Sequence, residues 1–155
     1  MAVVLADVLD ERHVTLALQA QTCDAALREI AGTMAGVAHL RDVDRFVHEV
    51  RVREQSHSTL VGNGVAFPHS RTELVEAIVL GIGRSSEGIP WDDTGARAHL
   101  IFLIAVPRRL ATSYLMCIGA LARITRDDAK REQLMAMATA AQLIELLREA
   151  SLELA

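Results

Sequence analysis

The sequence predicts a single-domain α/β sandwich, in which a mixed β-sheet is flanked by helices on both faces. The first observation is the stretch 98–106, AHLIFLIAV, which is almost wholly apolar and typical of a central strand buried on both faces. The second is that strand-like segments are interleaved with amphipathic helical patterns along the chain. The third is composition: 155 residues, 51% of them hydrophobic, are enough to bury one core, so we assign residues 1–155 to one domain.

Composition and charge exclude several classes of function. The net charge is −4 and the 16 basic residues are scattered, which does not suit a nucleic-acid-binding surface. Cys23 and Cys117 lie far apart and form no CxxC motif, so we expect reduced thiols in a cytoplasmic protein. The apolar start, Met1 to Leu5, lacks a basic region and is soon followed by acidic residues. We therefore expect neither a signal peptide nor a membrane-spanning segment.

The first half of the chain predicts one strand and two helices. Residues 14–19 alternate between larger apolar and smaller or polar side chains, which indicates a half-buried strand. Thr22 is expected to cap a helix that stops near Gly36. A second helix is expected to begin near Asp42, because its apolar residues follow the i, i+3, i+4, i+7 spacing, and to end around 53–54.

The second half predicts two further strands. Residues 77–83 are rich in β-branched residues and indicate a strand. Gly88, Pro90 and the run DDTG at 92–95 are turn-forming residues, so we expect a loop between this strand and the apolar one. Pro107 ends the apolar strand.

Three helices are expected to follow. The first covers about 111–124, with Leu115 among the residues that face inward. The second opens with the acidic pair 127–128. The third begins at Thr139, which with Gln142 has the form of a capping box.

The stretch 58–71, STLVGNGVAFPHSR, holds the densest cluster of special residue types. The Gly-Asn-Gly run at 62–64 can adopt positive φ angles at low cost. Residues 65–67 indicate a short buried strand, and Pro68 stops strand hydrogen bonding and fixes the direction of the chain. His69 is therefore expected to be held on a stiff exit from that strand.

A histidine held in this way suits phosphoryl transfer. The attacking group must be an uncharged ring nitrogen, and an ordinary pKa near 6.5 leaves histidine largely neutral. The other ring nitrogen can donate to a backbone carbonyl and so fix the tautomer. Bound phosphate is expected to contact a planar guanidinium, short hydroxyls and a nest of backbone N–H groups, with no metal and no cofactor. The predicted contacts are Arg53, the hydroxyls of Ser58 and Thr59, and the N–H groups of Asn63 and Gly64.

Each of these residues also has a structural alternative. A single Pro-His pair is weak evidence of function, and the run 62–64 could simply be a turn into a strand. Arg53 could complement a helix dipole, and Ser58 and Thr59 could cap local backbone. A metal site is not expected, because His39, His48 and His57 are nine residues apart, which is no ligand spacing on one helix face.

The residues RE at 53–54, ST at 58–59 and GNGxAxPH at 62–69 resemble the signature of enzyme IIA domains of the bacterial phosphotransferase system. The resemblance is to the fructose, mannitol and nitrogen-regulatory type (type 2), and it covers essentially the whole chain. It implies an α/β fold with a mixed sheet flanked by helices. It also implies that His69 accepts a phosphoryl group from the histidine-containing phosphocarrier protein. The group then passes to a cysteine or histidine of enzyme IIB, or its presence regulates partner proteins such as a kinase or transporter.

One position departs from the family pattern. Many members carry a second histidine, before a leucine, at the start of the helix that follows the Val-Pro strand end. Tyr114 stands at the best-aligned position here, and tyrosine can donate a hydrogen bond but does not readily gain positive charge. The pair Arg108-Arg109 could supply the missing charge, or could be a solvated turn.

The sequence leaves alternatives open. A regulatory protein-binding module with weak or no phosphotransfer is favoured by Tyr114 and by the length, which resembles the nitrogen-regulatory branch. A small-molecule-binding domain that has lost phosphotransfer is the third hypothesis. The sugar, the phosphoryl acceptor and the oligomeric state do not follow from the sequence.

Overall fold

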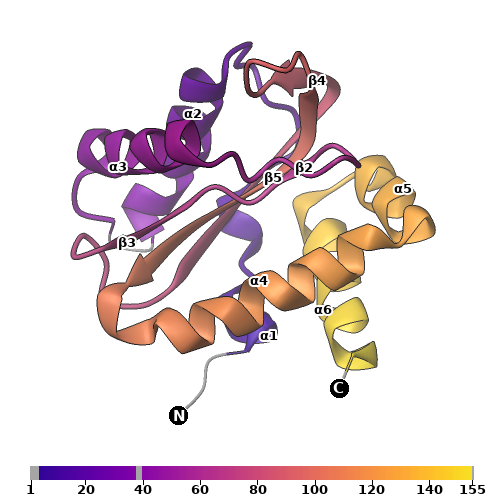
Figure 1. Cartoon of the computed structure of the whole chain (residues 1–155). Coiled ribbons are helices and arrows are strands. Elements are labelled where there is room, and N and C mark those ends of the chain that lie inside the picture. Colours follow the sequence, from indigo (N-terminus) through magenta and orange to yellow (C-terminus); the bar gives the residue numbers. More distant parts are fainter. Residues whose placement is uncertain (1–3, 38–39, 155) are drawn as a thin grey trace.

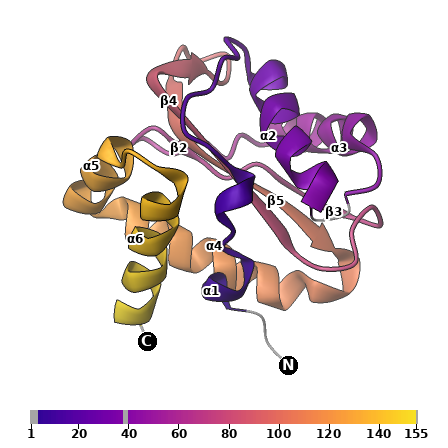
Figure 2. The ribbon, with the colours of Figure 1, turned by 180° about the vertical axis from the view of Figure 1, so that it is seen from behind.

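A computed structural model describes residues 4–37 and 40–154 of the chain. A mixed five-stranded sheet lies between two helical layers, with α2 and α3 on one face and α1, α4, α5 and α6 on the other (Figures 1 and 2). The predicted fold class is therefore confirmed. The helices are α1 (Leu5–Val8), α2 (Cys23–Val37), α3 (Val43–Ser56), α4 (Ala111–Arg126), α5 (Asp128–Ala136) and α6 (Ala140–Glu153). The strands are β1 (Val14–Thr15), β2 (Val65–Ala66), β3 (His69–Thr72), β4 (Val79–Pro90) and β5 (Arg97–Pro107), and short 3₁₀ turns cover Glu11–His13 and Arg108–Leu110.

The sheet is organised around β5. It pairs antiparallel with β4, and β4 pairs parallel with β1. On its other side β5 pairs parallel with β2 and then with β3, so these two short strands follow one another along the same edge. Among the described strands, β3 pairs only with β5, which places its residues at an edge of the sheet.

Alternation along β5 builds the two halves of the core, as expected for a strand covered on both faces. Ile101, Leu103 and Ala105 pack with α2 and α3. Phe102 and Ile104, which point the other way, pack with α1, α4 and α6. All five side chains are buried, so the prediction of a central strand at 98–106 is confirmed.

Helix α2 approaches the sheet closely because β4 carries glycines beneath it. A Cβ built on Gly81 would lie 2.7 Å from Cγ2 of Ile30, and one built on Gly83 would lie 2.5 Å from Cδ1 of the same residue. At either position, a residue with a Cβ would collide with the Ile30 side chain unless Ile30 shifted. These glycines therefore set the spacing between helix and sheet.

The predicted helix starts are confirmed by their caps. Oγ1 of Thr22 accepts from the Ala25 N–H at 3.1 Å, and a carboxylate oxygen of Asp42 accepts from the N–H of Arg45 at 3.0 Å. The capping box of Thr139 and Gln142 is present at the start of α6. Helix ends were placed less well, because α2 continues past Gly36 to Val37 and α3 continues to Ser56.

The expected bounds of two strands were wrong. β1 covers only residues 14–15, although the Leu18 N–H still donates to the Arg84 carbonyl of β4 at 3.0 Å. β4 runs on through Gly88 and Pro90, because a register shift between Arg84 and Ile89 absorbs the irregularity at Gly88, which has φ +84°.

The inward face of α4 also differs from the expectation. Leu115 is 62% exposed, whereas Ser113, Cys117, Leu121 and Ile124 are buried. Apolar residues occupy more than one face of this helix, and the small residues Ser113 and Cys117 pack inward instead of Leu115. Within the part of the chain that the structure describes, none of the helices has the length and apolar character needed to cross a membrane.

Candidate functional site

His69 lies at the start of β3, on the edge of the sheet. It pairs with Ile104 in parallel register, and the carbonyl of Pro68 accepts from the Ile104 N–H at 3.0 Å. Pro68 has no N–H to donate, but its carbonyl keeps the chain attached to β5. The proline therefore interrupts the edge strand without ending it, and His69 stands inside a resumed strand rather than on an exit from one.

The His69 ring is held through both of its nitrogens. Nδ1 lies 3.0 Å from the carbonyl oxygen of Phe67, and Nε2 lies 2.9 Å from Nε of Arg53 at the end of α3. An arginine Nε–H can only donate, so Nε2 must accept and carry no proton. The single proton of the neutral ring is therefore on Nδ1, where it is donated to Phe67. This arrangement leaves Nε2 unprotonated, with a lone pair that could act as a nucleophile.

Burial and charge keep this ring neutral. Desolvation of the half-buried side chain lowers the pKa of His69 below its ordinary value of 6.5. The hydrogen bond to the Phe67 carbonyl raises the pKa, and the positive charge of Arg53 lowers it again, with burial the largest contribution. The net direction is downward, so the ring stays uncharged at neutral pH.

We expect the pH dependence of His69 to follow from this lowered pKa. Phosphoryl uptake is expected to persist to lower pH than a histidine with an ordinary pKa would allow, and to decline only when the ring gains a proton. The folded state binds this proton less readily than the unfolded chain does. The free energy of unfolding should therefore also fall as the pH drops below the unfolded pKa. A titration of His69 by NMR checks this prediction, and a midpoint above 6.5 would contradict it.

Tyr114 lies against His69. The two ring centroids are 4.9 Å apart and the planes are tilted by 38°. Burial raises the pKa of Tyr114 above its ordinary value of 10, so its hydroxyl stays neutral. Tyr114 stands in the first turn of α4, the positive end of the helix dipole. The Tyr114 hydroxyl, at the start of α4, can therefore donate a hydrogen bond to an anion.

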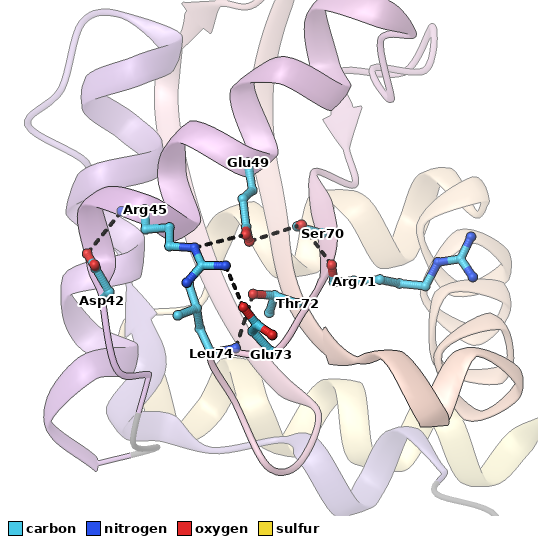
Figure 3. A network of polar contacts seen from close by, with 8 residues as sticks. All are labelled: Asp42, Arg45, Glu49, Ser70, Arg71, Thr72, Glu73 and Leu74. Carbon is cyan, nitrogen blue, oxygen red and sulfur yellow. Dashed lines mark hydrogen bonds and ion pairs between the residues drawn. The ribbon is translucent and has the colours of Figure 1, made fainter.

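Arg71 is a cation near His69 that sequence reasoning missed. Side chains alternate along β3: Ser70 faces α3, where its hydroxyl lies 3.4 Å from a carboxylate oxygen of Glu49, and Arg71 points to the opposite side (Figure 3). His69 and Arg71 therefore share one side of the strand. The charge of Arg71 also lowers the pKa of both His69 and Tyr114. The i, i+2 spacing within a strand was the signal that could have found it.

Ser58 and Thr59 have their hydroxyls committed elsewhere. Oγ of Ser58 donates to a carboxylate oxygen of Asp92 at 3.1 Å. Oγ1 of Thr59 donates to Glu54 in a very short hydrogen bond and accepts from the N–H of Phe67 at 3.1 Å. Neither hydroxyl makes a described contact with the His69 ring. Thr59 instead supports the backbone just before it.

Asn63 and Gly64 are not brought to His69. The Asn63 amide donates to the carbonyl of Thr125 at 3.2 Å, and Gly64, with φ +82°, packs against His99. The residue after Gly64 pairs with Leu100 on β5, whereas His69 pairs with Ile104. Four residues along a strand span about 13 Å. The Gly-Asn-Gly run is therefore a turn that anchors the edge strand to α4, and it builds no nest around the His69 ring.

The charge of the side chains around His69 indicates the kind of ligand that they suit. Within residues 4–37 and 40–154, the structure shows no group of three or more His, Cys, Asp or Glu side chains arranged to hold a metal ion. The groups that surround His69 are two guanidinium cations and a phenol, which suit an anion rather than a cation.

The chain resembles known proteins in both sequence and fold. Residues 7–150 match the family model described as phosphoenolpyruvate-dependent sugar phosphotransferase system, EIIA 2. The chain belongs to this family. A nitrogen regulatory protein of Bradyrhizobium diazoefficiens is 28% identical over 92% of this EIIA chain and 94% of its own length. The crystal structure of the nitrogen regulatory protein IIA-Ntr from Neisseria meningitidis superposes with a TM-score of 0.83 at 24% identity, covering 92% of this chain and 97% of that one.

Some relatives of this EIIA chain are much longer. The fructose-specific EIIABC component of Bacillus subtilis (strain 168) is 23% identical over 94% of this chain, but the chain spans only 23% of that protein. The shared region is the IIA part of a larger polypeptide.

Proposed function

We propose that His69 accepts a phosphoryl group from the phosphohistidine of the histidine-containing phosphocarrier protein and passes it on to enzyme IIB in the cytoplasm. The observation that carries this proposal is the unprotonated Nε2, fixed by the Phe67 carbonyl at one end of the ring and faced by Arg53 at the other. Membership of the EIIA family supports it, because the family belongs to a phosphotransferase system.

The transfer step uses three groups around the ring, which are two side chains and one backbone carbonyl. Nε2 attacks phosphorus, the new N–P bond forms as the donor's N–P bond breaks, and the donor imidazole leaves with the electron pair. Arg53 must release Nε2 as the attack begins, because its Nε–H occupies the lone pair that attacks, and its N–H groups move to the phosphate oxygens, where a charge-assisted hydrogen bond is stronger. The Tyr114 hydroxyl donates to the same phosphate. The Phe67 carbonyl stabilises the positive charge that develops on the ring through Nδ1–H.

A regulatory role is the second candidate function, and Tyr114 is the observation that favours it. A neutral phenol stands where many relatives have a histidine, so it adds no positive charge beside the phosphate. A phosphoryl group on His69 would change the surface charge by about two units. The same site could therefore control docking onto a kinase or transporter with slow onward transfer.

The test is phosphoryl uptake by the whole chain. The protein is mixed with phosphoenolpyruvate, enzyme I and the phosphocarrier protein, and its mass is followed with time. We expect one added phosphoryl group that is lost in acid and stable in base, as an N–P bond requires. No uptake from any phosphohistidine donor would reject the proposal. Uptake without onward transfer to any enzyme IIB would favour the regulatory role.

Arg71 is expected to make a small contribution to phosphoryl uptake. Exposed ion pairs are worth about 0.2–1 kcal/mol, so Arg71→Ala should slow uptake by roughly 2- to 5-fold. The difference should shrink when salt is raised, because exposed charges are screened. Uptake rates at low and high salt check this. Arg41→Ala, which removes an exposed arginine paired with Glu76, is the matched control. An equal effect of both variants would show that Arg71 has no specific role.

A further inference from the structure

Glu54 is a buried carboxylate next to the site that the transfer step does not use. It is 8% exposed and follows Arg53 near the end of α3. Oε2 accepts from the Thr59 N–H and from the indole N–H of Trp91, each at 3.0 Å, and Oε1 accepts from the Thr59 hydroxyl. Among the described residues no Lys, Arg or His forms an ion pair with it. Three neutral donors therefore satisfy a group that is costly to bury.

The hydrogen bonds of Glu54 lead to the His69 ring in a fixed direction. A carboxylate oxygen can only accept, so the Thr59 hydroxyl must spend its one proton on Glu54. The Thr59 oxygen is then left as an acceptor, and it receives the N–H of Phe67 at 3.1 Å. The carbonyl of the same residue accepts from Nδ1 of His69 at 3.0 Å. Phe67 is thus held at both its N–H and its carbonyl.

We propose that Glu54 and Thr59 are positioning residues, which hold Phe67 so that its carbonyl keeps the His69 proton on Nδ1 and leaves Nε2 free to attack. The proposal rests on the proposed phosphoryl transfer at His69. Neither residue touches the phosphate. A tilted Phe67 carbonyl would let the proton move to Nε2, and a protonated Nε2 has no lone pair for phosphorus.

Two replacements of Thr59 separate positioning from packing. Thr59→Val keeps the shape but cannot accept from Phe67 or donate to Glu54, whereas Thr59→Ser keeps the hydroxyl. We expect Thr59→Val to raise the Nε2-protonated fraction of His69 in ¹⁵N NMR spectra. It should also slow phosphoryl uptake about 10-fold, the effect of losing one hydrogen bond, here that between Nδ1 of His69 and the Phe67 carbonyl. Thr59→Ser is expected to restore both values.

Glu54→Gln provides a second test of the positioning role. The glutamine N–H₂ is a donor, so it cannot accept the hydrogen bonds that Thr59 and Trp91 donate to the carboxylate. Its matched control is Glu49→Gln on the same helix. The Glu49 carboxylate contacts Ser70 and Arg45, but it takes no part in the hydrogen bonds that run from Glu54 through Thr59 to Phe67. Circular dichroism establishes that each variant is folded. If Glu54→Gln does not fold, the valine and serine variants still decide the question.

Different results would contradict the proposed phosphoryl transfer at His69 and the proposed positioning role of Glu54 and Thr59. Equal tautomer ratios in the Thr59→Val and Thr59→Ser proteins would overturn the positioning role, whatever the uptake rate. The tautomer measurement needs no phosphoryl donor, so it remains decisive if the wild-type protein takes up no phosphate. In that case the proposed function fails while the positioning of the ring is still tested.

Discussion

Replacing His69 with glutamine is expected to abolish phosphoryl uptake, a loss of at least about three orders of magnitude. Glutamine fills similar space and can accept from Arg53, but its amide offers no nucleophilic nitrogen. The fold is expected to survive, because His69 is only half-buried at a sheet edge and its main partners are Arg53 and the Phe67 carbonyl. The measurement is the mass of the protein after incubation with the phosphorylated carrier.

The control for this variant is His48→Gln, which removes an exposed histidine from α3. It should take up phosphate at the wild-type rate. Acid-labile phosphate on the His69→Gln protein would place the phosphoryl group on another residue, and the assignment of the nucleophile would then be wrong.

Replacing Arg53 with alanine is expected to slow phosphoryl uptake by roughly 10- to 150-fold. Hydrogen bonds to charged groups contribute about 1.5–3 kcal/mol, and 1.36 kcal/mol corresponds to a factor of ten in rate. The same change removes a cation that lowers the pKa of His69, so that pKa is expected to rise. Arg53→Lys should recover only part of the rate, because lysine keeps the charge but loses the planar fork.

Arg45→Ala is the matched control for Arg53. Arg45 also lies on α3, but its guanidinium contacts Glu49 and Glu73 (Figure 3), and it makes no described contact with the His69 ring. Uptake rates and NMR titrations of the variants check both effects. A pKa of His69 that does not move in Arg53→Ala would contradict the electrostatic part of the argument.

The fold was predictable where local signals agree with tertiary packing. The caps at Thr22, Asp42 and Thr139 and the apolar run of β5 each point to one structure, and the chain folds accordingly. β4 was cut short at the sequence level, because Gly88 is a turn residue by type but lies in a strand irregularity.

The inward face of α4 was misassigned for a related reason. The pattern of apolar residues favoured Leu115, but the tertiary environment buries the smaller Ser113 and Cys117 in its place. A helix with apolar residues on more than one face does not define its packing surface from periodicity alone.

The centre of the site was easier to predict than its surroundings. His69 and Arg53 were predicted to act together from residue chemistry and from the family pattern; their roles stay a prediction, but the structure places Nε of Arg53 2.9 Å from Nε2 of His69. Asn63 and Gly64 were misplaced because closeness in sequence is not closeness in space along an extended strand. Arg71 was missed because its role depends on strand alternation, which only the resumed strand after Pro68 reveals.

The position of β3 at the rim of the sheet has a consequence for the speed of exchange. A phosphohistidine donor is expected to approach Nε2 from the sheet edge once the Arg53 side chain moves aside, without any strand or helix separating from its neighbours. Turnover is therefore expected to be governed by how often two proteins collide in the right orientation, and to respond to protein concentration and ionic strength rather than to thermal loosening of the core.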